Sequence, residues 1–195
     1  MQRGVSKQLI LTASALLLVL VAAFAWFYIP KDPDAGTDVK TGGGVQLTVR
    51  LYLVSDENGV ETETQIERIA VQNAVPGTQT RYRIKVTNDS AEKDYFVSFS
   101  MGGFRSENDD FTLCRYLALA ENTVVHDPAA SPAGEIVYTG GFTELSGGSI
   151  TPDSSVPLAE NLFLGAGEGL QLTFVLQFEK AANNQNQQKT VFIDK

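Results

Sequence analysis

The sequence predicts an all-β protein: an antiparallel, jelly-roll-like β-sandwich that forms a single domain after an N-terminal hydrophobic export segment. Apolar and polar residues alternate with a period of two in several segments, most clearly in 45–53, 75–101 and 170–178. Turn-forming Asn, Gly and Pro separate these segments, and no stretch after residue 44 has the apolar spacing of a long helix. Roughly eight short strands with turns between them are typical of a sandwich or jelly roll.

Composition limits the size and the partners of the protein. A chain of 195 residues is long enough for one domain with a proper core and short for two. The formal net charge is −8, and without the first 25 residues, which hold Arg3 and Lys7, 13 basic residues face 23 acidic ones. This balance argues against nucleic acid and anionic lipid headgroups as partners, and it is typical of a protein kept soluble outside the cell.

Residues 1–29 predict an export segment, for which two interpretations remain open. Residues 9–29 carry no charge, and a short basic head precedes them. As a signal peptide, the segment has a small-x-small cleavage site that ends at Ala25. As a signal anchor, its apolar run is long enough to cross a bilayer, with aromatic residues at the outer interface. In both cases the N-terminus stays inside and the domain goes outside, so we expect an extracellular or cell-surface protein.

A third interpretation is a pilin-type leader that is cut after Gly4, although such pilins usually carry a Glu where this chain has Leu9. Residues 30–44 are rich in Gly, Thr and Asp and predict a linker. The β-sandwich domain is then expected to span residues 45–195.

The first strands of the domain follow from the alternation of apolar and polar residues. Residues 45–53 predict a long strand, and Asn58-Gly59 lies at the centre of the turn that follows. Residues 62–71 predict a weaker strand, because Ile66 and Ile69 are out of phase with a strict period of two.

Residues 75–101 predict a β-hairpin-like unit around which the rest of the chain is organised. Both of its strands have an apolar face, and the first strand also has a basic, water-facing side with Arg81, Arg83 and Lys85. Asn88-Asp89-Ser90 is the turn between the strands. Such a unit is not stable alone in water, so the remaining strands are expected to form a second layer over it.

Shorter strands and loops make up the second half of the domain. Residues 111–119 fit either a strand or a short helix, and we predict a strand because the neighbouring segments are strands. Residues 140–157 are rich in Gly, Ser, Thr and Pro and predict an extended surface excursion. Residues 165–169 predict a turn before the strand 170–178. The remaining predictions are short strands at 123–125, 136–138 and 191–193, an apolar lead-in at 158–164, and loops at 127–134 and 181–188. Whether the last strand is complete at Lys195 stays open.

No residue is predicted to be catalytic, to bind a cofactor or to bind a metal, so we predict that the protein is not an enzyme. His126 is the only histidine, which excludes a zinc site built on histidines, and it is expected in a solvated loop. Cys114 is the only cysteine, so no internal disulfide can form. The apolar run around Cys114 predicts a buried side chain and not a nucleophile.

Two local patterns leave alternatives open. Glu107, Asp109 and Asp110 could bind calcium through hard oxygen ligands, but they lack the spacing of a known calcium loop, and solvated surface is the simpler interpretation. Asn88-Asp89-Ser90 matches a glycosylation sequon and, more simply, the turn described above.

Four parts of the chain resemble the camelysin/TasA-type family of exported bacterial biofilm-matrix and surface proteins. The small and aromatic residues of 22–27 resemble the end of that family's signal peptide, and 45–54 lies where its first domain strand lies. Residues 75–90 resemble its Pro-Gly turn, strand and Asn-containing turn. Residues 170–178 followed by 184–193 resemble its closing pair of strands, although Asn186-Gln187-Gln188 stands in place of the family's aromatic-Gln-Gly step. The middle of the chain has no such likeness.

The resemblance implies a jelly-roll-like sandwich that is exported through a dedicated signal peptidase and assembles into extracellular fibres. In such fibres the mature N-terminal segment can add as a strand to the next subunit, and here it would begin at Trp26-Phe27-Tyr28-Ile29. An apolar extended end seeks an unpaired sheet edge, where main-chain hydrogen bonds supply the affinity. Some family members are labelled metallopeptidases, but this chain has no histidine pair to support that activity.

These observations predict a non-catalytic secreted or cell-surface protein, a structural or assembly subunit of extracellular matrix or fibres formed by β-strand addition. Its partners would be copies of itself or other surface and matrix proteins. The alternative is an extracellular binding module for a glycan or an envelope protein, tethered to the membrane by uncleaved residues 9–29. The residue at the mature N-terminus distinguishes the two.

Overall fold

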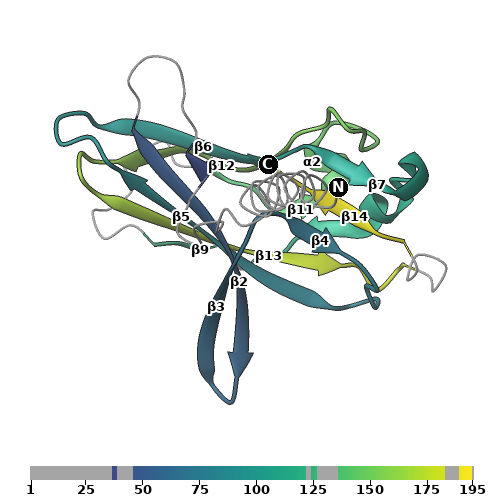
Figure 1. Cartoon of the computed structure of the whole chain (residues 1–195). Coiled ribbons are helices and arrows are strands. Elements are labelled where there is room, and N and C mark those ends of the chain that lie inside the picture. The colour runs from purple at the N-terminus through teal and green to yellow at the C-terminus, as the bar shows by residue number, and fades with distance from the viewer. Residues whose placement is uncertain (1–36, 39–45, 122–123, 127–135, 183–188, 195) are drawn as a thin grey trace, which may run out of the picture. The chain divides into compact units, whose positions relative to one another are not determined.

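A computed structural model of the chain confirms the all-β antiparallel sandwich (Figure 1). The residues after Ala35 form one unit. Within that unit the structure describes residues 37–38, 46–121, 124–126, 136–182 and 189–194. The predicted export segment, residues 1–29, lies outside the described residues, as does most of the predicted linker.

The first layer of the sandwich is a sheet of eight described strands. These are β1 (Thr37–Asp38), β2 (Leu47–Glu57), β3 (Val60–Ile66), β5 (Gln79–Asn88), β8 (Leu117–Leu119), β9 (Val124–His126), β11 (Gly140–Gly141) and β13 (Gly169–Phe178). Neighbours follow the order β1, β2, β5, β13, β8 and β11, while β3 also pairs with β2 and β9 with β13. The long strands β2, β5 and β13 are therefore adjacent, with Val86 opposite both Val49 and Leu170.

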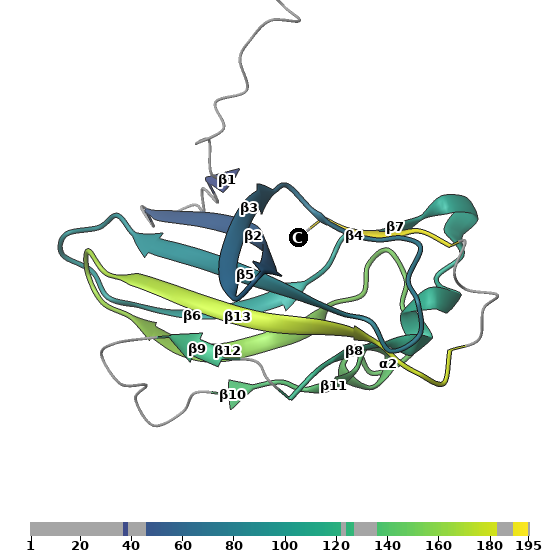
Figure 2. The ribbon, with the colours of Figure 1, turned by 90° about the horizontal axis from the view of Figure 1, so that it is seen from below.

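Two three-stranded sheets lie against the first one. Their strands are β4 (Ile69–Val71), β6 (Tyr95–Met101), β7 (Phe104–Ser106), β10 (Ile136–Val137), β12 (Val156–Leu164) and β14 (Val191–Ile193). One sheet has the order β10, β12, β6 and the other the order β4, β14, β7. Because only Gly102-Gly103 separates β6 from β7, the two sheets together act as the second layer. In Figure 2, β10 and β12 lie on one side of β6, and β4 and β7 lie toward the other.

The core lies between the layers and is filled by alternate residues of the long strands. The inward-facing residues of β13 and β12 are fully or almost fully buried: Val156, Leu158, Leu162, Leu164, Leu170, Leu172, Phe174, Leu176 and Phe178. Tyr82 of β5 stacks on Phe174 with 5.5 Å between ring centroids. The period of two in these strands thus creates one apolar face in each layer, and the two faces cover one another.

The unit predicted as a hairpin, residues 75–101, is instead a connection between the two layers. β5 pairs with β2 and β13, whereas β6 pairs with β12, so the two strands do not pair with each other. The prediction was wrong because a period of two shows which residues face the core. The same period of two occurs in strands that share a sheet and in strands that face one another across the core, so it does not show which strands pair.

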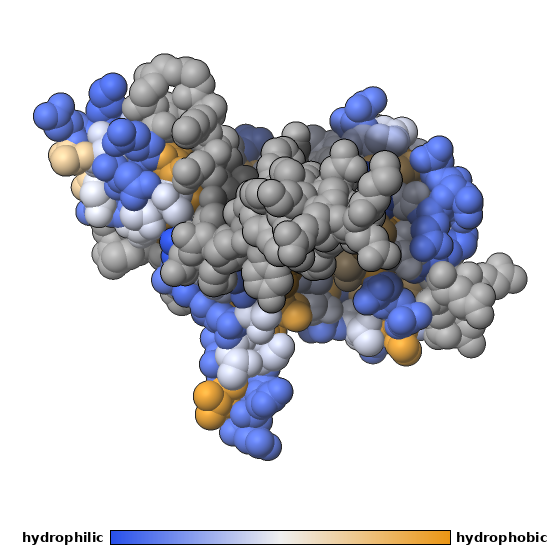
Figure 3. All heavy atoms as spheres, viewed as in Figure 1, coloured by the Kyte–Doolittle hydropathy of each residue, from blue (hydrophilic) through white to orange (hydrophobic). Residues whose placement is uncertain are grey.

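The strand predicted at residues 62–71 is divided between layers. It separates into β3, which pairs with β2, and β4, which pairs with β14. This division explains why Ile66 and Ile69 are out of phase. β2 and β3 form a hairpin whose predicted Asn58-Gly59 turn is confirmed, with φ of 59° and 80°. The hairpin projects from the rest of the sheet (Figure 1), and its surface is mostly hydrophilic (Figure 3).

Two predictions in the middle of the chain were wrong in part. Residues 111–119 begin as a 3-10 helix, η2 (Thr112–Tyr116), and only then form β8, because the consecutive residues Leu113 and Cys114 are both buried and a strand cannot bury both on one face. The supposed excursion 140–157 contains the short helix α2 (Phe142–Leu145), and its apolar residues Phe142 and Ile150 are anchored in the core.

Candidate functional site

Among the described residues, one side of the sandwich is open along β6. β6 is the terminal strand of its sheet, so no described strand pairs with its second edge. β14 and β4 extend the second layer only beside the three residues of β7. We call the free edge of β6, with the inner face of β2, the open side.

The floor of the open side is apolar. Leu47, Val49, Leu51 and Leu53 of β2 point toward the interior, since the register places them beside the core residues of β5. They are only half-buried, whereas every inward-facing residue of β13 is buried. Removing such apolar surface from water stabilises a structure by roughly 25 cal/mol per Å². The floor would therefore gain free energy from a further apolar strand above it.

The free edge of β6 lacks the features that usually protect an edge strand. Its residues are Tyr, Phe, Val, Ser, Phe, Ser and Met, with no charge and no proline. β3, at another edge, carries Glu61 and Glu63. Charges and prolines discourage pairing with another chain, whereas bare N–H and C=O groups invite it. The open side thus suits an extended, uncharged segment.

The outer face of the first layer holds an ion-pair ladder. Arg81 binds Glu61 at 2.7 Å, and Arg83 binds Glu61 at 3.2 Å and Glu63 at 2.5 Å. Lys85 binds Glu63 at 2.5 Å. The basic side predicted for this strand is thus present, but its cations are engaged by the carboxylates of β3. The ladder stabilises the β2–β3 hairpin on the sheet and is not a free site for an anion.

The ladder is expected to weaken in acid. Burial alone would raise the pKa of Glu63, but hydrogen bonds from Lys85 and Arg83 outweigh it, so the pKa lies below its usual value of 4.5. A carboxyl whose pKa is lower in the folded state contributes stability that is complete above its unfolded pKa. That stability is lost as the pH falls through the folded pKa. Urea denaturation between pH 7 and pH 3 measures the effect.

Glu63→Gln is expected to lower the free energy of unfolding at pH 7 by about 1 kcal/mol and to flatten its decline below pH 4.5. Glu57→Gln, at the exposed tip of the same hairpin, is the matched control and should leave the profile unchanged. An identical acid profile for Glu63→Gln and the unaltered chain would contradict the role of the ladder.

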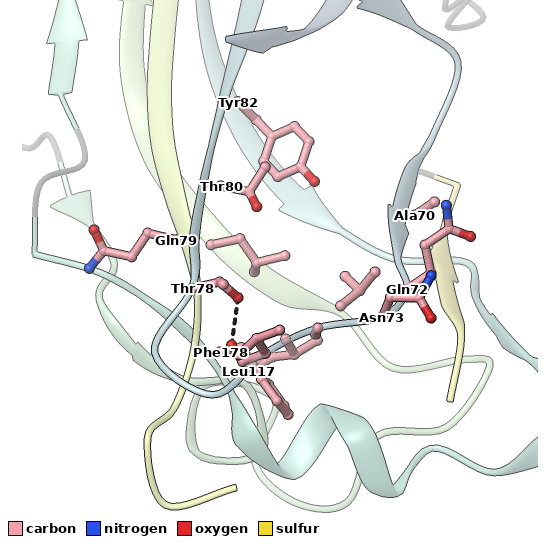
Figure 4. Close-up of a pocket in the computed structure, with 13 residues that line it drawn as sticks. Ala70, Gln72, Asn73, Thr78, Gln79, Thr80, Tyr82, Leu117 and Phe178 are labelled. Carbon is pink, nitrogen blue, oxygen red and sulfur yellow. Dashed lines mark hydrogen bonds between the residues drawn. The ribbon is translucent and has the colours of Figure 1, made fainter. Parts of the chain in front are cut away.

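A small pocket of about 290 Å³ lies between β4 and the start of β5 (Figure 4). Its lining holds no charged side chain; Tyr82, Leu117 and Phe178 contribute apolar surface, and Gln72 and Thr78 are among the polar residues. Burial raises the pKa of Tyr82 to about 12, so its hydroxyl stays neutral at physiological pH. A lining without charged side chains suits a small uncharged group.

The two residues considered for nucleophilic or zinc chemistry are Cys114 and His126. Cys114 is buried, as predicted, and burial raises the pKa of its thiol to about 12, so the reactive thiolate is not formed at neutral pH. His126 was expected in a loop, but its backbone ends β9 opposite Gln171. The prediction was wrong because β13 has an edge available beyond β8, and this edge orders the segment as a strand.

The acidic cluster considered for calcium is partly occupied by protein contacts. Asp110 binds Lys189 at 2.7 Å and accepts a hydrogen bond from the Thr112 hydroxyl at 2.6 Å. The bond from Lys189, with those from Thr112, lowers the pKa of Asp110 well below its usual range. Glu107 and Asp109 lie in the 3-10 helix η1 (Glu107–Asp109). Across the described ranges, no three Asp, Glu, His or Cys side chains are grouped so as to hold a metal ion.

The sequon Asn88-Asp89-Ser90 is a turn in the structure. The Asn88 side chain is fully buried, and its Nδ2 donates hydrogen bonds to Lys93 O at 2.7 Å and to Gly165 O at 2.9 Å. A side-chain amide in this environment is not accessible to a glycosylating enzyme in the folded protein. The turn interpretation of this segment is therefore the one that the structure supports.

Comparison with known proteins gives no match. The searches found no matching model of a known protein family, no matching curated protein and no matching solved structure. The resemblance to the camelysin/TasA-type family thus stays a prediction. None of the helices in the described part of the chain is long and apolar enough to cross a membrane, and the apolar run 9–29 lies outside that part.

The open side was not predicted from the sequence, although β6 carries one unusual residue on its outer face. In β6 the polar phase of the alternation contains Ser98 and Ser100, but also Phe96. A single aromatic residue in the water-facing phase of a strand is common in itself, and only its pairing with a second exposed apolar residue would mark a contact surface. The free edge itself had no signal, because it depends on which strands become neighbours.

Proposed function

We propose that the protein is a non-catalytic secreted or cell-surface assembly subunit, and that copies of it join by β-strand addition at the open side. The observation that carries the proposal is the combination of a free, uncharged strand edge with a half-covered apolar floor. A strand placed there would pair with β6 through main-chain hydrogen bonds and cover the inner face of β2. This mode of recognition takes its affinity from the backbone and its specificity from alternate side chains.

The segment proposed to occupy the open side is Trp26-Phe27-Tyr28-Ile29 of a second copy. It is uncharged, rich in residues that favour strands, and exposed at the chain end if cleavage occurs after Ala25. Seven residues lie between Ile29 and Thr37, the first residue of β1, and the eight steps along the chain can span at most about 28 Å. This tether allows the segment to leave its own domain and reach a neighbouring one.

Cross-linking between copies tests the proposal. One tagged copy carries Tyr28→Cys or Ile29→Cys, so that either face of the added strand is sampled. The other carries Ser98→Cys or Ser100→Cys, two exposed positions on β6. Native Cys114 is buried and is expected not to react with the cross-linker. A short thiol-specific cross-linker is expected to join donor and acceptor copies, and electron microscopy of the same exported protein should show fibres.

Thr64→Cys on β3 is the matched control, because it lies on an exposed edge that carries charge. Two results would contradict the proposal. One is equal cross-linking to Thr64→Cys, and the other is monomers at every concentration with no cross-link to β6. The mature N-terminus is determined by mass spectrometry on protein from its native cell. Retention of Met1 would instead favour the membrane-tethered binding module.

A further inference from the structure

Phe96 is the most exposed large apolar residue in the described part of the chain, at 66%. It lies on the outer face of β6, directly opposite Phe163 of β12. The two rings pack edge to face, with 5.6 Å between their centroids. A paired aromatic surface of this kind, left in water on an otherwise small and polar face, marks a contact surface.

The position of this pair relative to the open side determines what it can contact. Phe96 belongs to the strand whose second edge is free, with Phe163 on the paired side. A strand added at the free edge would place one side chain directly opposite Phe96, with Cβ atoms about 5 Å apart. Its diagonal neighbours would lie about 7 to 8 Å away, still within reach of an aromatic ring. The added residue would extend a row that already contains Phe163 and Phe96.

The chemistry of the added segment indicates which residues enter this row. Successive residues of a strand point to opposite faces, so Phe27 and Ile29 share one face and Trp26 and Tyr28 the other. Phe27 and Ile29 have no polar side-chain atom and match the apolar floor. Trp26 and Tyr28 each carry one polar group that needs water or a partner, which suits the outer face.

We propose that Phe96 and Phe163 form the outer wall of the acceptor site, and that Trp26 of a second copy packs against Phe96, directly opposite or one diagonal step away. This inference rests on the proposed strand addition and specifies its register and its specificity. The acceptor site then has two apolar surfaces, the floor on β2 and the wall on β6. It selects a segment that is apolar on both faces and discriminates against an ordinary amphipathic strand.

Trp26 is the only tryptophan of the chain, so its fluorescence reports the contact directly. On assembly of the exported protein, its emission should move to shorter wavelength and its quenching by acrylamide should fall. Phe96→Ser is expected to reverse much of both changes. It should also weaken assembly about fivefold, which corresponds to the loss of the binding contribution of one aromatic pair. Phe96→Tyr keeps the ring and should restore both.

Val60→Ser is the matched control, because Val60 is also highly exposed, at 62%, but lies on the β2–β3 hairpin. It should change neither assembly nor fluorescence. The proposed role of the outer wall would be wrong if Phe96→Ser left Trp26 emission and assembly unchanged while cross-linking to Ser98→Cys or Ser100→Cys persisted. That result would still support strand addition. Absence of that cross-linking with Phe96 in place would overturn both. Thermal unfolding of Phe96→Ser shows whether a loss of assembly reflects a loss of folding.

Discussion

Replacing Asn88 by Ala is expected to lower the free energy of unfolding by about 3 to 5 kcal/mol, a large part of the stability of a domain this size. Asn88 is fully buried at the end of β5, where the chain crosses from the first layer to the second. Its side chain donates to Lys93 O and Gly165 O and accepts a hydrogen bond from Ser90 N at 3.0 Å. Alanine would leave all three backbone groups without this partner.

The hydrogen bonds of Asn88 join two connections that are distant in the sequence. Lys93 lies in the connection from β5 to β6, and Gly165 lies in the connection from β12 to β13. The backbone N–H of Asn88 also donates to Glu168 O at 2.9 Å. One side chain therefore holds together the two places where the chain passes between the layers at this end of the sandwich, and its loss should loosen both.

Asn88→Asp provides a second test with a defined pH dependence. The carboxylate has nearly the same shape, but it cannot donate to the two carbonyl oxygens and brings a buried negative charge toward them. We expect it to destabilise at pH 7 at least as much as Asn88→Ala. Protonation restores one donor, so the deficit should shrink as the pH falls through the raised pKa of the buried carboxyl.

Urea denaturation followed by circular dichroism measures both variants. Asp89→Ala is the matched control: its side chain makes one exposed hydrogen bond, from the Thr48 hydroxyl, and its loss should cost about 1 kcal/mol or less. A loss below about 1 kcal/mol for Asn88→Ala would show that the turn does not depend on the amide.

Phe142→Ala is expected to cost about 3 to 5 kcal/mol through the cavity that it leaves. Phe142 begins the helix α2 and is fully buried. Its ring packs edge to face against Phe104 of β7, with 6.1 Å between centroids. Because four residues cannot form a stable helix on their own, the anchor in the core is what orders this segment.

The matched control is Glu144→Ala, an exposed position in the same helix, which should change stability by less than about 0.5 kcal/mol. Thermal or urea unfolding compares the two. Similar small effects for Phe142→Ala and Glu144→Ala would mean that residues 140–157 are the surface excursion that the composition predicts, with no share in the core.

The amino-acid sequence by itself determined where the long strands lie and which of their side chains face inward. The alternation in residues 170–178 predicted β13 and its buried face, and the apolar run around Cys114 predicted a buried thiol. These features depend on the period of two and on hydrophobicity, which are local and readable without a structure. The same local rules placed Asn58-Gly59 in the turn of the β2–β3 hairpin.

Only the tertiary structure decided which strands are neighbours. It placed β5 and β6 in opposite layers, converted part of 111–119 to a 3-10 helix, and left the second edge of β6 without a described partner strand. A strand pattern specifies the face that is buried but not the partner at either edge, because every backbone offers the same N–H and C=O groups. The open side is a property of this pairing, which long-range packing selects.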